Sequence, residues 1–266
     1  MSDSAEKSTA WKMTPDDYLR RHSPRFRGSY RLSSCYVTVR DGTRLAVDIH
    51  LPEDTENQAW PTLLIFTPYY RRFRVKMAHP ATVEASPNTA QYRDFFVPHG
   101  YVVVVVDVRG TGASFGFRDG FRSPLEREDY RALVDWVVRQ SWCNGKIGSI
   151  GISYVGAAAC FLATTGHPAV KAVVPTFAVW DTYSDHFYPG GLLLSHLPPA
   201  YGALTRALDL DPRDEVKQYA YFADPRFEGP APVDEDKDCR LRDQAVIGHT
   251  ANVDVNDFIR EFAFRD

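Results

Sequence analysis

The stretch Lys146–Gly156 reads Lys-Ile-Gly-Ser-Ile-Gly-Ile-Ser-Tyr-Val-Gly, and it decides the fold that the rest of the chain is expected to adopt. Three isoleucines among small residues predict a short buried strand over 147–152, and the apolar segment that follows Ser153 predicts a helix. A strand that turns directly into a helix strains the residue at the joint, so we expect a positive φ at Ser153. Such a joint is tolerated where close neighbours lack bulk, and Gly151 and Gly156 meet this condition.

A joint of this kind, a nucleophile elbow, holds a serine hydroxyl clear of the sheet. The backbone N–H of the next residue, here Tyr154, then becomes an oxyanion donor at the helix N-terminus. The usual pattern is Gly-x-Ser-x-Gly, whereas Val155 takes the place of the second glycine here and Gly156 follows it. A structural turn without chemistry is the alternative interpretation of the same string, so the neighbouring segments have to decide between the two.

Composition is that of an ordinary globular protein. The 266 residues are 44% hydrophobic and 24% charged, and the formal net charge is −3. This balance does not point to nucleic acid or to a membrane surface as a partner, and the length allows one large domain with a substantial core.

The first residues lack the apolar centre of a signal peptide, and the longest apolar run, Val102–Val106, is far too short to span a bilayer. We therefore expect a cytoplasmic protein. The four cysteines have no metal-type spacing, which indicates reduced thiols and no metal site; they are Cys35, Cys143, Cys160 and Cys239. No organic cofactor is expected either.

Strands and helices are predicted to alternate up to residue 176. Thr14-Pro15 begins a short helix, Asp41-Gly42 is the signal of a two-residue hairpin turn, and Ser123-Pro124-Leu125-Glu126 is a capping box that begins a longer helix. Further helices are expected over 91–99 and 154–165, and strands over 36–39, 45–49, 60–66, 101–107, 147–152 and 170–175. Such alternation, with nearly continuous apolar runs, requires a mostly parallel sheet wrapped by helices.

Two other segments invite a functional interpretation. The basic run Arg71–Lys76 could receive an acidic partner, but such a run is more often a solvated loop, and we expect a loop. Arg109–Gly116 is a glycine-rich turn after a buried strand, as in dinucleotide-binding proteins. Its third glycine is one residue late, and Asp119-Gly120 and Ser123-Pro124 intervene before any helix begins, so the nucleotide interpretation is disfavoured.

With these residues laid out, the chain resembles the N-terminal part of the cocaine esterase and X-Pro dipeptidyl-peptidase group of α/β-hydrolases. The resemblance covers roughly residues 35–266 and rests on several motifs in the right order. The unusual spacing of the elbow is itself similar to the pattern of that group. The motifs are Val39–Ala46, Pro68-Tyr69, Gly100-Tyr101 with Asp107–Ser114, Asp135-Trp136 with Gln140–Gly148, and Gly151–Gly156.

The resemblance implies an α/β-hydrolase fold and a serine hydrolase that cleaves a small-molecule ester or a peptide through an acyl-enzyme. By it, Ser153 is the nucleophile, the backbone N–H of Tyr154 is one oxyanion donor, and the hydroxyl of Tyr69 is the second. For Tyr69 the alternative is a rim aromatic residue that only packs.

Residues 1–30 are then an N-terminal extension with a short helix, and 31–176 are the first part of the hydrolase core. Aromatic residues, prolines and charges mark 177–266 as a helical lid without a further buried strand, with short helices expected over 204–208, 215–222 and 255–262.

In the group, the catalytic acid and histidine follow the nucleophile on later strands, and nothing in 177–266 corresponds to them. We therefore expect the hydrolase fold to be incomplete at the C-terminus. The alternative function is a truncated or split non-catalytic half-domain, or one that needs a separately encoded C-terminal half for the acid and histidine. Its exposed strand edge would favour association, so a homo-oligomer is a further expectation. The chain contains residues that could replace the acid and the base, namely His167, His186, His196, His249, Asp254 and Asp257. We expect the four histidines among them to be structural or solvent-exposed.

Overall fold

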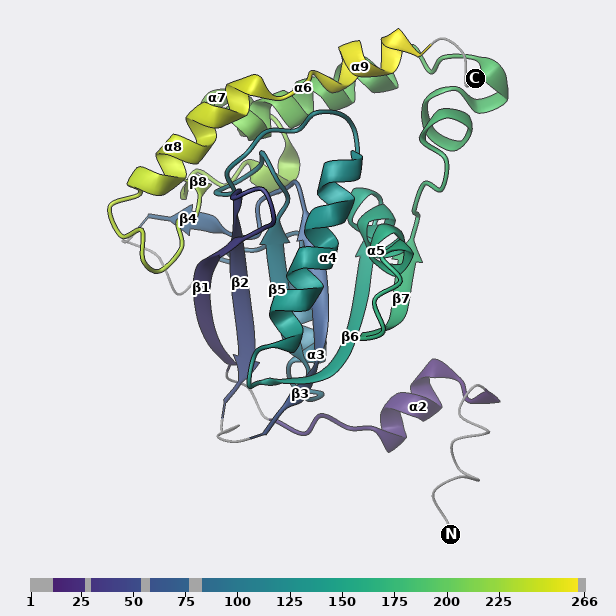
Figure 1. Cartoon of the computed structure of the whole chain (residues 1–266), viewed down its shortest axis with the longest axis vertical. Coiled ribbons are helices and arrows are strands. Elements are labelled where there is room, and N and C mark those ends of the chain that lie inside the picture. The colour runs from purple at the N-terminus through teal and green to yellow at the C-terminus, as the bar shows by residue number, and fades with distance from the viewer. Residues whose placement is uncertain (1–11, 27–29, 54–57, 77–82, 263–266) are drawn as a thin grey trace.

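The structure is a computed structural model of the chain, and it describes residues 12–26, 30–53, 58–76 and 83–262. Figure 1 shows a central sheet with helices packed against it and a layer of helices across one end. The expected loose residues 1 to about 10 lie outside the described residues.

Six of the described strands form one sheet in the order β1-β2-β5-β3-β6-β7. β5, β3, β6 and β7 run parallel to one another, and β2 joins β5 in antiparallel orientation. The predicted mostly parallel sheet is therefore confirmed. The strands are β1 (Tyr30–Thr38), β2 (Arg44–Pro52), β3 (Trp60–Thr67), β5 (Val102–Asp107), β6 (Cys143–Ile152) and β7 (Val170–Thr176).

The hairpin between β1 and β2 has a longer turn than predicted. Val39 donates its N–H to the carbonyl of Thr43 at 2.8 Å, so three residues, and not two, connect the strands. Gly42, the last of the three, has a φ of 84°, a conformation that glycine adopts without strain. The Asp-Gly signal was thus correct in position and wrong in turn type, because the same pair also suits a three-residue turn that ends in a left-handed glycine.

Helices cover the two faces of the sheet. The even-numbered valines of β5 pack in one apolar cluster with α4 and α5, and the odd-numbered valines pack in a second cluster with α3. All five valines of β5 are 0% exposed, which explains their uninterrupted run in the sequence. The helices up to β7 are α2 (Pro15–Arg21), α3 (Ala90–Phe96), α4 (Pro124–Val138) and α5 (Tyr154–Thr164).

The segment after β7 lies across the carboxyl ends of the parallel strands (Figure 1). It begins with a π-helical turn, Thr182–Phe187, and continues as α6 (Leu197–Leu210), α7 (Arg213–Val216), α8 (Arg240–Gly248) and α9 (Val255–Glu261). The expectation that it holds no buried strand was wrong. β8 (Phe227–Pro230) pairs in antiparallel orientation with β4 (Phe73–Val75) in a separate two-stranded sheet. A four-residue strand that contains glycine and proline has no readable alternation.

Candidate active site at the carboxyl end of the sheet

Ser153 lies at the joint between β6 and α5. Its φ is 60° and its ψ is −121°, so the predicted positive φ is observed. The backbone N–H of Ser153 donates to the carbonyl of Thr176 at 3.0 Å, which fixes the joint against the end of β7. Its hydroxyl makes no capping bond to α5, whereas the serine before α4, Ser123, does cap its helix. The strained conformation therefore does not serve to cap the helix.

Gly151 and Gly156 are required by close approaches around the elbow. A Cβ on Gly151 would lie 2.3 Å from the side chain of Val155. A Cβ on Gly156 would lie 2.7 Å from the carbonyl oxygen of Thr176 and 2.8 Å from that of Gly151. Position 156, and not 155, is where the first turn of α5 meets the backbone of β6 and β7. This contact explains why the second glycine comes one residue late.

Tyr154 begins α5, and its side chain connects the elbow to Glu126 of α4. The ring is 2% exposed, and its hydroxyl donates to a carboxylate oxygen of Glu126 at 2.6 Å. The hydroxyl of Tyr130 donates to the other oxygen of the same carboxylate. Burial raises the pKa of Glu126, and the two hydroxyl donors offset part of that rise. The predicted capping box is thus only half formed, because Ser123 accepts the N–H of Glu126 at 3.3 Å while the Glu126 carboxylate binds the tyrosines.

Tyr69 follows the end of β3 at the same edge of the sheet. Thr67 Oγ1 accepts the N–H of Tyr69 at 3.0 Å, and the Asn88 amide donates to its carbonyl at 2.9 Å. The Tyr69 ring meets the Tyr154 ring edge to face, with centroids 6.3 Å apart. Its hydroxyl forms a hydrogen bond of 2.9 Å with the hydroxyl of Tyr201 on α6. The structure therefore places Tyr69 beside Tyr154 and adds Tyr201, which the sequence analysis had missed because 132 residues separate the two hydroxyls.

Two of the four candidate histidines are engaged away from the elbow. His249 is 1% exposed, and its ring nitrogens lie 3.0 Å and 2.7 Å from the carbonyl oxygens of Asp209 and Ser114. Asp254, considered as its acid, instead caps α9 by accepting backbone N–H groups. His167 lies 3.2 Å from a carboxylate oxygen of Asp135.

The other two histidines lie on the segment above the sheet. His196 immediately precedes α6 without a side-chain capping bond. His186 belongs to an aromatic cluster around the elbow: its ring centroid lies 6.1 Å from that of Phe121, which in turn lies 5.8 Å from Tyr154. Burial lowers the pKa of His186 to about 4, so the imidazole is neutral near pH 7. Its Nδ1 is buried and has no hydrogen-bond partner among the described residues.

An apolar cavity of about 240 Å³ lies next to this cluster. Phe121 lines the cavity and also packs on the Tyr154 ring. The other lining residues include Phe187 of the π-helical turn, Tyr188 directly after it, and Phe258 and Ile259 of α9. The cavity therefore offers an apolar group a place close to the elbow.

The basic run Arg71–Lys76 is not a solvated loop. Arg71 is 0% exposed, and its guanidinium pairs with Asp48 on β2 at 2.8 Å and with Asp107 at the end of β5 at 2.9 Å. The prediction was wrong because both carboxylates lie far from the run in sequence. Residues Phe73–Val75 of the run form β4, and Arg72 also pairs with Asp48, at 2.8 Å.

The glycine-rich turn Arg109–Gly116 wraps the carboxylate of Asp107. That carboxylate accepts the N–H of Arg71 at 2.6 Å and the N–H of Ala113 at 3.0 Å. A Cβ on Gly112 would lie 2.4 Å from it. The turn thus encloses an anion of the chain itself, and α4 begins only at Pro124.

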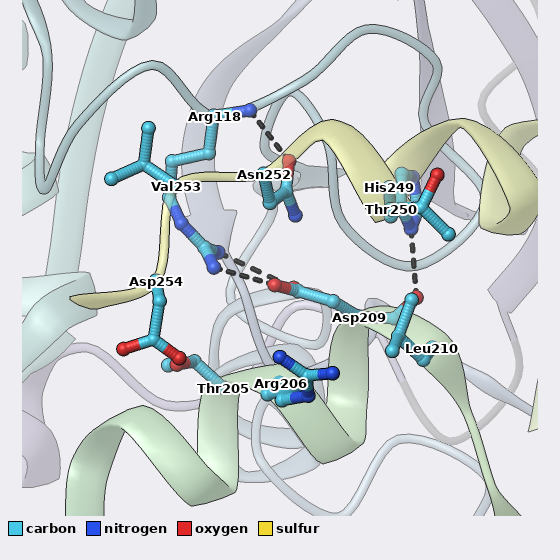
Figure 2. Close-up of a pocket in the computed structure, with 10 residues that line it drawn as sticks. All are labelled: Arg118, Thr205, Arg206, Asp209, Leu210, His249, Thr250, Asn252, Val253 and Asp254. Carbon is cyan, nitrogen blue, oxygen red and sulfur yellow. Dashed lines mark hydrogen bonds and ion pairs between the residues drawn. The ribbon is translucent and has the colours of Figure 1, made fainter. Parts of the chain in front are cut away.

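The C-terminal segment is fixed to this turn around a pocket of about 120 Å³, shown in Figure 2. Arg118 pairs with Asp209 of α6 at 2.5 Å and donates its N–H to the side-chain oxygen of Asn252 at 2.6 Å. The Asn252 amide donates to the carbonyl of Gly110 at 2.8 Å. Because Arg118 and Asp209 neutralise each other, we interpret this pocket as a structural contact.

Within the ranges that the structure describes, no group of three or more His, Cys, Asp or Glu side chains is arranged to hold a metal ion. No helix in the described part of the chain is both long and apolar enough to cross a membrane.

Residues 41–252 match the family described as X-Pro dipeptidyl-peptidase (S15 family). A "Putative serine esterase" of Mycobacterium bovis is 40% identical over 263 residues, which cover 97% of this chain and 41% of that protein. The cocaine esterase of Rhodococcus sp. is 37% identical over 169 residues, which cover 62% of this chain and 27% of that enzyme. The chain therefore spans about two fifths of the length of its mycobacterial relative.

Among solved structures, the chain is similar to a CocE/NonD family hydrolase from Staphylococcus aureus. The TM-score is 0.54 with 25% sequence identity, and the match covers 66% of this chain and 33% of that one. The sheet, its helices and this likeness confirm the expected α/β-hydrolase fold.

Proposed function

The chain belongs to the X-Pro dipeptidyl-peptidase (S15) family, and we propose that it carries the nucleophile of a serine hydrolase that cleaves an ester or an amide. The observation that carries the proposal is the strained conformation of Ser153 between β6 and α5. Backbone strain persists where the surrounding structure enforces it, and at Ser153 two glycines and the Thr176 carbonyl do so.

In the proposed reaction the Ser153 oxygen attacks the carbonyl carbon of the substrate and gives its proton to a general base, which passes a proton to the alcohol or amine that leaves. The negative charge that develops on the carbonyl oxygen is stabilised by the Tyr154 N–H at the N-terminus of α5 and by the Tyr69 hydroxyl. The contact between the Tyr69 and Tyr154 rings supports this assignment, because it brings both donors to one edge of the sheet. Water then releases the acid from Ser153. The apolar cavity beside Phe121 suits an apolar part of the substrate.

Labelling with a fluorophosphonate tests the proposal, because such a probe reacts with an activated serine. We expect one adduct per chain, its loss in Ser153→Ala and its retention in Ser141→Ala, which changes an exposed serine just before β6. An adduct that survives Ser153→Ala would contradict the proposal. So would the absence of an adduct at Ser153 in an assembled enzyme.

A second candidate is a half-domain that acts only with a separately supplied acid and histidine. The observation that favours it is the outer side of β7, the last strand in the sheet order. Large apolar side chains are exposed on and after this strand: Val174 is 50% exposed, Phe177 85%, Trp180 78% and Leu192 76%. An apolar surface of this kind marks a contact site. Light scattering measures the molar mass in solution, and denaturation measures the cooperativity of unfolding. An oligomer or a complex supports this candidate, and a monomer that unfolds cooperatively contradicts it.

A further inference from the structure

Arg122 differs from the other buried arginines in the described part of the chain. Four of these five side chains, Arg71, Arg93, Arg109 and Arg118, each pair with a carboxylate at 2.5 to 2.8 Å. Arg122 is 7% exposed and pairs with no carboxylate among the described residues. Its Nε and Nη1 are buried and have no hydrogen-bond partner there. A buried, unpaired cation is strongly unfavourable, so the site is suited to an anion that binds from outside.

The Arg122 guanidinium lies beside the elbow. Its central carbon is 5.3 Å from the centroid of the Tyr154 ring and 4.5 Å from that of Phe121. Tyr154 follows the proposed nucleophile directly, and Phe121 lines the apolar cavity. Burial raises the pKa of the Tyr69 phenol, and the hydrogen bond with Tyr201 and the positive charges of Arg122 and Arg118 offset part of this rise.

No carboxylate among the described residues pairs with this guanidinium, although its charge offsets part of the rise that burial causes in the pKa of Glu126. Both oxygens of Glu126, four residues further along, accept hydroxyls of Tyr130 and Tyr154. The backbone of Arg122 has a φ of 59°, which is uncommon for a residue other than glycine. Arg122 is therefore held in a strained conformation beside the ring of Tyr154, with two donor nitrogens that have no partner among the described residues.

We propose that Arg122 binds a carboxylate group of the substrate, so that the hydrolase prefers an ester or amide that carries a negative charge close to the scissile bond. The inference rests on the proposed function of Ser153 and specifies its substrate class. A guanidinium donates two hydrogen bonds to one carboxylate, which gives both affinity and orientation. The ring faces of Tyr154 and Phe121 hold the guanidinium in place by cation–π contact.

Binding to the Ser153→Ala variant tests the preference without turnover. The probes are 4-nitrophenyl hydrogen succinate, which carries a carboxylate, and its neutral methyl ester, and the measurement is isothermal titration. We expect the anionic ester to bind roughly 10- to 100-fold more tightly than the neutral one, as for a buried charge-assisted contact. In Ser153→Ala/Arg122→Gln this ratio falls to about one while the affinity for the neutral ester stays the same.

Two further variants serve as controls. Arg122→Lys keeps the charge without the planar fork and is expected to keep part of the preference. Arg127→Gln removes an exposed arginine of α4 and is expected to leave the ratio unchanged. Equal binding of the two esters to Ser153→Ala, or no binding of either, overturns the inference, even if Arg122→Gln does not fold. Fluorophosphonate labelling of Ser153 reports on the proposed function separately, so failure of one is distinguishable from failure of the other.

Discussion

Two clusters of buried polar groups lie at the carboxyl ends of the parallel strands, and they differ in how they use their charges. Around Asp107, the Arg71 guanidinium has carboxylate partners on two strands, and backbone N–H groups complete the site. Around Ser153, nitrogens of Arg122 and His186 are buried without a partner among the described residues. The first cluster stabilises the fold, whereas we propose that the unpaired donors and acceptors of the second serve a ligand.

The largest expected effect comes from Arg71. Arg71→Leu leaves the carboxylates of Asp48 and Asp107 buried without their shared partner, and we expect a loss of about 3–5 kcal/mol in the free energy of unfolding. Urea denaturation measures it. Arg74→Leu is the control from the same run, because its ion pair with Glu228 is exposed, and a change within about 0.5 kcal/mol is expected. Equal effects of the two substitutions would show that the Asp107 cluster does not stabilise the fold.

The elbow glycine gives the next largest effect. In Gly156→Ala the new Cβ meets two backbone oxygens, and we expect a loss of about 1–3 kcal/mol together with slower labelling of Ser153. Gly248→Ala is the matched control, because a Cβ at that helical position in α8 meets nothing within 4 Å. It is expected to be neutral or to stabilise by up to about 1 kcal/mol. Unchanged stability and labelling of Gly156→Ala would contradict the steric account of the elbow.

Comparison of Tyr154→Phe with Tyr130→Phe distinguishes an effect on the reactivity of Ser153 from an effect on the stability of the fold. Each phenylalanine substitution removes one hydroxyl from the buried carboxylate of Glu126, and we expect each to cost about 1–2 kcal/mol. Only Tyr154→Phe is expected to slow the labelling of Ser153, because Tyr154 is the first residue of the elbow helix. If both variants slowed labelling equally, the hydrogen bonds to Glu126 would act through α4 and not through the elbow.

The smallest effect concerns the partly exposed ion pair between Asp41 and Arg109. Partial burial raises the pKa of Asp41, but the hydrogen bonds from Arg109 and Thr43 and the charge of Arg109 together outweigh burial and lower the pKa from 3.8 to about 2. The contribution of Asp41 to stability is therefore present above pH 3.8 and is lost as the pH falls towards 2. Asp41→Asn should remove this part of the acid dependence, by no more than about 1 kcal/mol, because the pair is partly exposed. An unchanged acid limb of the unfolding curve would contradict the assignment.

Sequence patterns predicted the parts of the fold that local rules determine. The buried strands, the helix that begins at Thr14-Pro15 and the strained joint at Ser153 follow from periodicity, capping and steric limits within a few residues. The type of the hairpin turn was wrong, because two turn types share the Asp41-Gly42 signal.

Long-range contacts could not be predicted in this way. Arg71 resembled a solvated residue, because its carboxylate partners lie 23 and 36 residues away on other strands. Glu126 looked like a capping residue until Tyr154, 28 residues later, was found to donate to it. Arg122 is unusual because no carboxylate of the described residues pairs with it in the folded chain. A local sequence pattern does not contain this information.

Rapid-quench mass spectrometry with 4-nitrophenyl acetate tests the central claim, that Ser153 forms an acyl-enzyme, most directly. We expect one acetyl group to appear on the peptide that contains Ser153, at the rate at which 4-nitrophenol is first released. In Ser153→Ala both the acetyl group and the initial release should be lost. Acetylation spread over surface lysines, with the same release of 4-nitrophenol by Ser153→Ala, would contradict the account.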